Sequence, residues 1–232
     1  MSTKQKLRAF FQARWHAVVK KTKPKIIAFY GHANAGKGFL SNFYRSPFTF
    51  VLPSYKYVPE AYKGKTVRVQ WAEQAIMLLK AAMFEDEEAW EALLKAETPH
   101  ECKALGRKVQ NFDDSKWIPS LMAISSTVIE QKFRQNAELE QRLFAFGDAA
   151  FNDVAFAEAT QYDKLWGTGC TIQEAKDVDN WKGVNILGWA LTLFRKTRLQ
   201  ELEAEENRES ELTNAGSTGT GSTRAGSTGT GS

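Results

Sequence analysis

Residues 71–84 read WAEQAIMLLKAAMF and predict a helix that is apolar on most of its sides. Such a helix is expected to be buried, so the rest of the domain should pack around it. Two charged residues, Glu73 and Lys80, nevertheless lie within it. Their separation is nearly two helical turns, or roughly 10.5 Å of rise, so both lie on one stripe of the helix together with Met77 and Phe84.

The stripe that carries Glu73 and Lys80 is expected to line a pocket, because a buried charge is costly unless it is paired or faces a wet cavity. A desolvated lysine has a lowered pKa and can be nucleophilic, including toward the aldehyde of an opened sugar. A carboxylate on the same wall can transfer protons. The alternative is that Lys80 extends a buried stem to solvent, and that Glu73 only interacts favourably with the helix dipole.

The segments before and after this helix differ in pattern. Before it, residues 25–70 are rich in β-branched and aromatic residues and predict strands at 25–31, 48–53 and 65–70. After it, helical patterns predominate, with expected helices at 85–97, 99–109, 119–135, 136–146 (Asn136 as N-cap) and 185–206, and one strand within 152–160. The predicted fold class is α+β: a single, mainly α-helical domain with a small β-rich N-terminal part.

The two ends of the chain are expected to lie outside this domain. Residues 3–21 predict an amphipathic helix, ended by Pro24, that docks on the domain, with a membrane surface or a targeting presequence as alternatives. The sequence AGSTGTGS occurs at 215–222 and again at 225–232 and predicts a disordered linker. The expected parts are a basic helix at 1–24, the folded domain at 25–200, and a charged helix end with the repeat tail at 201–232.

The composition is that of a soluble globular domain, with 43% hydrophobic and 25% charged residues. No apolar run approaches the roughly 20 residues of a membrane span, so a transmembrane protein is not expected. The two cysteines, Cys102 and Cys170, lie far apart without a CxxC motif, which favours a reducing, cytoplasmic compartment over a disulfide framework or a zinc site. The three histidines are scattered, so no metal site is predicted.

Basic residues are concentrated at the N-terminus, although the net charge is only +4. The first acidic residue is Glu60, and many lysines and arginines precede it. Such a segment suits an anionic partner, such as phosphates, nucleic acid or a membrane surface, or it forms a merely solvated basic face. Nucleic acid is therefore a candidate partner of this N-terminal segment.

Residues 31–37 read GHANAGK and are similar to the start of a phosphate-binding P-loop. A P-loop continues with a Ser or Thr that holds Mg²⁺ and with a helix whose N-terminus faces the phosphates. Here Gly38 takes the place of that hydroxyl, and an aromatic segment with Pro47 follows. ATP hydrolysis is therefore not expected, and the glycines should instead let a loop turn tightly beside a ligand or a neighbouring element.

Six short motifs occur in order over about residues 27–199. They are GFLSNFYRSPF with Asn42 and Phe43 at its centre, WAEQAIMLLKAAMF with Glu73 and Lys80, ALGRKV with Gly106 and Arg107 (Trp117 follows), KFRQN at 132–136, DKLWGTG with Asp163, Trp166, Gly167 and Gly169, and GVNILGWAL with Gly183 and Asn185. Together they resemble the NADAR family, also called YbiA-like, of N-glycosidases. Two positions depart from its pattern: Gln74 stands where the family has His, and Met77 stands where it has Gln. Gln74 can hydrogen-bond but cannot shuttle protons.

The resemblance implies a YbiA-like fold and an enzyme that hydrolyses the N-glycosidic bond between a ribose and a base. The implied substrates are small phosphorylated N-glycosides, namely phosphoribosylamino-pyrimidine intermediates of riboflavin synthesis, or ADP-ribose attached to guanine. The implied mechanism is attack by the lysine on the anomeric carbon, giving a Schiff base that water releases. No cofactor and no metal are implied, and the oligomeric state is not indicated.

The resemblance also assigns roles to residues. Lys80 is expected to be the nucleophile, Glu73 to assist proton transfer, and Asp163 to bind the ribose hydroxyls or to be the second carboxylate. Arg107 is expected to hold phosphate, since a guanidinium fits phosphate in two-pronged fashion, and Trp166 to stack on the base or shape the pocket. Alternatives are a turn residue for Asp163, a surface position for Arg107 and core packing for Trp166. The other substrate-binding candidates are Asn42, Trp117, Gly167, Gly169, Gly183 and Asn185, whereas Phe43 is expected only to pack.

Two other functions fit the same residues. One is a binding module that holds NAD, ADP-ribose or a modified nucleic acid without cleaving it. The other is a base-removing enzyme directed to nucleic acid, in which the basic N-terminal segment would grip phosphates.

Overall fold

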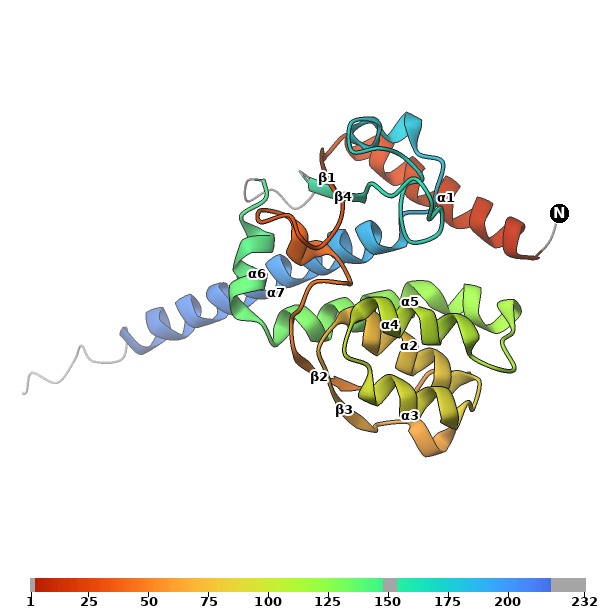
Figure 1. The fold of residues 1–232 in the computed structure, drawn as a ribbon. Helices are drawn as coiled ribbons and strands as arrows, with labels where there is room; N and C mark the ends of the chain where they lie inside the picture. Colours follow the sequence, from red (N-terminus) through yellow and green to blue (C-terminus); the bar gives the residue numbers. More distant parts are fainter. Residues whose placement is uncertain (1–2, 148–153, 218–232) are drawn as a thin grey trace, which may run out of the picture. The chain divides into compact units, whose positions relative to one another are not determined.

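The computed structural model describes residues 3–147 and 154–217 (Figure 1). Contacts divide the chain into two units, residues 1–196 and residues 197–232. The described elements, in chain order, are α1 (Thr3–Thr22), β1 (Lys25–Phe29), β2 (Phe48–Val51), β3 (Thr66–Val69), α2 (Ala72–Met83), α3 (Glu87–Lys95), α4 (Pro99–Lys108), α5 (Asp114–Arg134), α6 (Ala137–Phe144), β4 (Val154–Glu158) and α7 (Ile186–Ser217). The expected α+β class is confirmed.

The strands form two small sheets. In the first, β1 and β4 pair in parallel, from Lys25 opposite Val154 to Phe29 opposite Glu158; Figure 1 shows these strands side by side although they are far apart in the sequence. In the second, β2 and β3 pair antiparallel, with Phe48 opposite Val69. Because β1 and β4 are parallel, the segments that follow them leave from the same edge of the sheet, where ligands bind in parallel sheets generally.

Helix α2 lies in the centre of the larger core, as its apolar pattern predicts. Every residue of α2 except Lys80 is buried. It contacts α3, α4 and α5, and its apolar side chains pack in one cluster with those of β2 and β3. The open edge of β2 is covered by α5, because the side chains of Gln131 and Gln135 each bond both the N–H and the C=O of one β2 residue, Val51 and Thr49 respectively.

Helix starts follow from capping residues. The side chain of Asp86 accepts the Ala89 N–H before α3, and Thr98 does the same for Glu101 before α4. The expected start of α5 at residue 119 is wrong, because Asp113 caps Ser115 and the helix begins at Asp114. Pro119 is tolerated within α5 at the cost of one backbone hydrogen bond. Asn136 precedes α6 as expected, but its side chain donates to the Lys132 carbonyl instead of capping.

Helix α1 docks on the domain through part of its predicted stripe. Trp15 and Val19 are buried in a cluster that also contains Ala157 and Trp181, and Lys20 forms an ion pair with Asp179. The rest of the stripe is less covered, since Phe10 and Val18 are 55% and 47% exposed. The side chains of Leu7 and Phe11, also expected on this stripe, lie outside the described residues.

Helix α7 runs from the domain core into the second unit. Its beginning is buried, and Leu187, Leu191 and Phe194 join a core cluster with β1 and β4. The helix continues to Ser217, beyond the expected end at 206, so the first three residues of the repeat tail are helical. The rest of the tail lies outside the described residues, and its disorder stays a prediction. None of the helices in 3–147 and 154–217 has the length and apolar character needed to cross a membrane.

Candidate active site

A cavity of about 700 Å³, here called the central cavity, opens beside α2 in the first unit. Its walls come from α2, α4, α5, the segment after β1, the loop 41–43 and the segment after β4. The structure brings together in this cavity most of the residues that the sequence singled out: Asn42, Glu73, Lys80, Arg107, Trp117, Asp163 and Trp166. The other four candidates, Gly167, Gly169, Gly183 and Asn185, do not line it.

The amine of Lys80 is held at the meeting point of α2, α4 and α5. Its Nζ donates to the carbonyl oxygen of Gly106 at 2.6 Å. It also lies 4.0 Å from the ring centre of Phe112 and 5.6 Å from that of Trp117. Gly106 makes this approach possible, because a Cβ there would lie 1.9 Å from the Met77 sulfur. The amine is thus fixed on the cavity wall, one side against protein and the other toward the cavity.

Glu73 lies on the same wall, in the first turn of α2. Its side chain is buried, and this burial raises its pKa to about 7; Lys103 and Arg107 oppose the rise, whereas Asp163 adds to it. A carboxyl group with a pKa near neutrality can both give and take a proton under ordinary conditions. Glu73 and Lys80 lie on one stripe of α2, as the sequence predicts. They therefore bring a proton-transfer group and an amine into one cavity.

Glu158, the last residue of β4, is a cavity residue that sequence reasoning missed. Its Oε2 is buried and has no hydrogen-bond partner in the part of the chain that the structure describes. Burial raises its pKa to about 8, with further increases from Asp163 and Glu73 and an opposing effect from Lys103. The sequence does contain a signal for Glu158, because it is an acidic residue at the carboxyl end of an apolar strand. In parallel sheets, ligand sites lie at such strand ends.

Asp163 is both a turn residue and a cavity residue. Its Oδ1 accepts the N–H groups of Leu165 and Trp166, each at 2.9 Å. These bonds fix the segment that carries Trp166, which is half-buried and packs against the core as well as lining the cavity. Asp163 is thus a turn residue and Trp166 packs in the core, as the alternatives for these residues predicted. Both residues also line the cavity.

Asn185 and the glycines act behind the cavity wall. Asn185 is fully buried, and its side chain accepts the Glu158 N–H and donates to the Phe156 carbonyl, which fixes the end of β4. A Cβ on Gly183 would lie 2.2 Å from the carbonyl oxygen of Gly167, and one on Gly167 would lie 2.7 Å from that of Glu158. These residues let three backbone segments pack together and so position Glu158.

Replacing Gly183 by alanine is expected to destabilise the protein by about 2 kcal/mol, because the new methyl group meets backbone rather than a flexible side chain. Gly36→Ala is the matched control, since its Cβ would meet only the Asn34 side chain, at 3.7 Å, and should change stability by less than about 0.5 kcal/mol. Urea unfolding of both variants measures the difference. Equal stability of the two would contradict the tight packing described here.

Lys132 supports the loop that carries Asn42. This fully buried amine donates to the carbonyl oxygens of Phe39 at 2.7 Å and Ser41 at 3.1 Å. The next residue, Asn42, lines the cavity with a buried Oδ1 that has no partner among the described residues, and its carbonyl accepts the Glu73 N–H. Burial lowers the pKa of Lys132 to about 7. Lys132 therefore ties α5 to both the Asn42 loop and the start of α2.

Lys132→Met is expected to lower stability by about 2 kcal/mol, because two buried carbonyls lose their donor. The difference in the free energy of unfolding between wild type and Lys132→Met should be larger at about pH 9 than at about pH 6. The folded wild type releases the Lys132 proton near pH 7 and the unfolded chain near its ordinary value of 10.5, so wild type gains stability as pH rises between these values. Urea unfolding at both pH values tests this, and a deficit that shrinks with pH would contradict a buried neutral amine.

Aromatic and basic side chains line the remaining cavity wall. The ring of Phe43 lies 4.9 Å from that of His100 and 6.0 Å from that of His32, between ring centres. Phe43 was expected only to pack, but it lines the cavity. Besides Lys80, the basic lining residues are Lys103, Arg107 and Lys164. A cavity with aromatic faces and several cations suits a ligand that has both a flat ring and phosphate groups.

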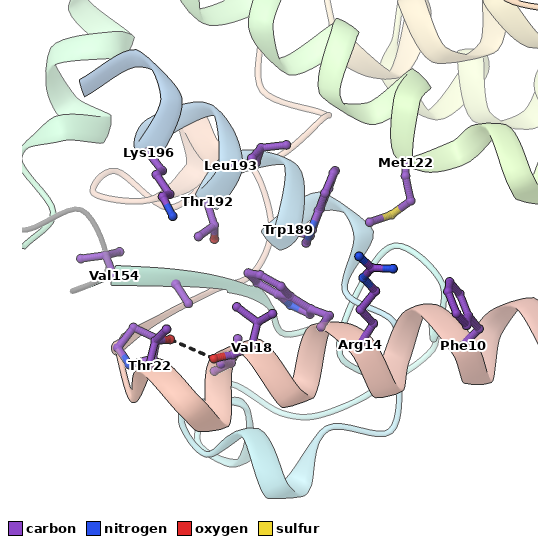
Figure 2. Close-up of a pocket in the computed structure, with 14 residues that line it drawn as sticks. Phe10, Arg14, Val18, Thr22, Met122, Val154, Trp189, Thr192, Leu193 and Lys196 are labelled. Atoms are coloured by element: carbon purple, nitrogen blue, oxygen red, sulfur yellow. Dashed lines mark hydrogen bonds between the residues drawn. The ribbon is translucent and has the colours of Figure 1, made fainter. Parts of the chain in front are cut away.

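A second hollow, here called the α1 groove, has a different character. Figure 2 shows side chains of α1, α5 and α7 around this groove of about 520 Å³. It is mostly apolar, with Trp15, Trp189 and Leu193 in its walls and Arg14 and Lys196 as its cations. None of the described residues that line it is Asp, Glu, His or Cys, so these residues offer no carboxyl, imidazole or thiol group for catalysis. The central cavity is therefore the candidate active site.

Comparisons with known proteins agree with this site. The sequence model of the NADAR domain matches residues 28–199, which include every residue of the central cavity. The chain is 33% identical over 131 residues to N-glycosidase R617 of Acanthamoeba polyphaga mimivirus, covering 56% of this chain and 74% of that protein. It is 30% identical over 174 residues to Protein irg-1 of Caenorhabditis elegans, covering 73% of this chain and 79% of that one.

A solved structure shows the same fold. The chain matches the NMR structure of the E. coli protein YbiA with a TM-score of 0.53 and 24% sequence identity, covering 78% of this chain and 87% of that one. At this identity the likeness concerns the fold alone. The domain match runs from the end of β1 into α7 and covers well over half of the chain, and on that basis the chain belongs to the NADAR domain family.

Proposed function

We propose that this chain is an N-glycosidase that hydrolyses the ribose–base bond of a phosphorylated nucleotide-type substrate in the central cavity, with Lys80 as nucleophile. The NADAR family and the likeness to N-glycosidase R617 support N-glycosidase activity in general. The observation that carries the finer proposal is the presence in one cavity of the Lys80 amine, the carboxyl group of Glu73 and a set of cations.

The proposed reaction begins when the neutral amine of Lys80 attacks the anomeric carbon of the ribose and the base departs with the electrons of the C–N bond. Glu73 takes a proton from the alkylated amine and passes it to the ring oxygen O4′ as the ribose ring opens, which gives a protonated Schiff base on Lys80. Water then adds to the same carbon, and the amine leaves with the O4′ proton as the sugar ring closes. The products are the base and the phosphorylated ribose part of the substrate (ribose phosphate or ADP-ribose), and Lys80 is regenerated.

The cavity offers a group for each part of such a substrate. Arg107 and Lys103 can hold phosphate, and the buried Oδ1 of Asn42 can accept a hydrogen bond from a ribose hydroxyl. Trp166 and Phe43 offer ring faces for the base. The substrate classes that fit are a phosphoribosylamino-pyrimidine of riboflavin synthesis and ADP-ribose on guanine. The volume of about 700 Å³ lies within the range of small-molecule sites.

The remaining proposals concern the setting of the enzyme. We expect a reducing, cytoplasmic environment, supported by two buried cysteines, Cys102 and Cys170, that are not disulfide-bonded. We propose nucleic acid as a partner of residues 1–24, a part separate from the domain at 25–200 and the tail at 201–232. A steep salt dependence of activity that disappears when residues 1–24 are deleted would support nucleic acid as the substrate.

The test is incubation of the pure protein with the phosphoribosylamino-pyrimidine, NAD, ADP-ribose and ADP-ribosylated guanine in DNA, followed by mass spectrometry of the released base or, for the modified DNA, of the released ADP-ribose. Release from one of them by wild type, absent in Lys80→Ala, is the expected result and identifies the substrate class. Binding of these ligands without release would instead favour the second candidate, a module that holds ADP-ribose or a modified nucleic acid without cleaving it.

A further inference from the structure

The departing base needs a proton, and the cavity contains one group well suited to supply it. Glycosidic bonds to neutral bases break readily only when the base is protonated as it leaves. The carboxyl and imidazole groups of the cavity are those of Glu73, Glu158, Asp163, His32 and His100. The two histidines are exposed on the aromatic wall, so the carboxyl groups are the donors enclosed in the cavity.

Two of the three carboxyl groups, those of Asp163 and Glu73, are less suited to donate this proton because of the groups around them. Asp163 already accepts two backbone N–H groups, so its Oδ1 is engaged in holding the turn. Burial raises the pKa of Glu73 on the Lys80 stripe, but two cations, Lys103 and Arg107, act against the rise and one acidic neighbour, Asp163, adds to it. Such a carboxylate is suited to take a proton from the amine or from water.

Glu158 has more acidic than basic neighbours. The groups that act on its charge are the carboxyl groups of Asp163 and Glu73 and the amine of Lys103, and burial together with the two acidic neighbours outweighs the cation. Its Oε2 is buried and has no hydrogen-bond partner among the described residues, although its backbone is firmly held: the N–H binds Asn185 Oδ1 and the carbonyl accepts from both the N–H and the hydroxyl of Thr168. The fold thus holds the Glu158 carboxyl group in the cavity wall, on a fixed backbone and in surroundings that favour its protonated form.

We infer that Glu158 is the catalytic acid that protonates the departing base, an inference that rests on the proposed function. As the C1′–N bond breaks, its electron pair stays on the base nitrogen, and the Glu158 proton moves to the base. The lone pair of the Lys80 amine forms the new bond to C1′. Glu158 is left as a carboxylate, and it is reprotonated by the water that later hydrolyses the Schiff base, the remaining hydroxide being added to C1′. No oxidant, reductant or other reactant is needed.

The test compares wild type, Glu158→Gln and Glu158→Ala on the substrate that wild type hydrolyses, with Glu130→Gln as control. Glu130 is on α5, where it pairs with Arg134 outside the cavity. Glu158→Gln keeps the shape of the protonated acid and should fold; its kcat is expected to fall about 100-fold or more, with KM changed less than about threefold. The kcat of wild type should decline above about pH 8, and Glu158→Gln should lack this decline.

Chemical rescue separates an acid from a merely structural residue. Added imidazole, whose cation can donate a proton near neutral pH, should restore the kcat of Glu158→Ala by about tenfold or more and leave Glu130→Gln unchanged. A Glu158→Gln enzyme with the wild-type kcat and pH profile, or a Glu158→Ala enzyme that is folded and not rescued, would overturn the inference while base release by wild type still supports the proposed function. Failure of wild type to release any base would overturn the proposed function, and this inference with it.

Discussion

Lys80→Ala is expected to lower kcat for base release by about 1,000-fold or more, because the variant loses the group that forms the covalent bond to the sugar. Lys80→Arg should be equally inactive, since a guanidinium keeps its charge at all accessible pH values and has no free electron pair for attack. The size of the cavity changes little in the arginine variant, so substrate binding should persist. Steady-state assays of base release, with ligand binding by calorimetry, measure both effects.

Lys108→Ala is the matched control for the Lys80 variants. Lys108 is an exposed lysine at the end of α4 and does not line the central cavity. It should keep wild-type activity. Substantial turnover by Lys80→Ala, within about tenfold of wild type, would contradict a nucleophilic lysine and leave only proton transfer by the carboxyl groups as the source of catalysis.

Glu73→Gln is expected to change activity and stability in opposite directions. Loss of the proton-transfer group should lower kcat by about 100-fold. The free energy of unfolding should instead rise by on the order of 2 kcal/mol at about pH 8, because glutamine has no charge to bury. Activity assays and urea unfolding of the same preparation measure the two changes.

The pH dependence of the Glu73 effect follows from its raised pKa. The unfolded chain releases the Glu73 proton near its ordinary value of 4.5 and the folded protein near 7, so the folded wild type loses stability as pH rises between these values. Glu73→Gln has no such loss. The two proteins should therefore be equally stable at about pH 4 and diverge by about pH 8; a Glu73→Gln protein that is less stable than wild type at about pH 8 would show that the charged form is stabilised in the fold.

Local sequence patterns predicted the parts of the structure that depend on neighbouring residues. The period of the apolar residues in 71–84 is a property of a single helix, so it predicted both the burial of α2 and the shared stripe of Glu73 and Lys80. The start of α5 was harder to predict, because Asp113 and Pro119 both mark a plausible beginning of the helix. Only the observed cap by Asp113 shows that α5 begins at Asp114. The docking of α1 followed from its apolar residues, but the exposure of Phe10 and Val18 did not, since it depends on the surface that α1 meets.

The failure of the sequence to identify Glu158 as a site residue has a different cause. Glu158 enters the cavity only because β4 pairs with β1, and no local pattern tells which strands pair. The same pairing explains Asn185, which the motif marked as a substrate-binding residue but which the structure places behind β4, bonded to its backbone. A motif shows that a residue is needed, but it does not distinguish a residue that faces the ligand from one that positions its neighbour.

The most direct test of the central claim is reductive trapping of the covalent intermediate. Wild type would be mixed with the substrate identified by base release and treated with sodium borohydride, which reduces a Schiff base to a stable amine, and then digested and analysed by mass spectrometry. The expected result is an adduct of the phosphorylated ribose part of the substrate (ribose phosphate or ADP-ribose) on the peptide that carries Lys80, absent from Lys80→Arg. Full turnover by wild type with no adduct on that peptide would contradict the proposal that Lys80 is the nucleophile.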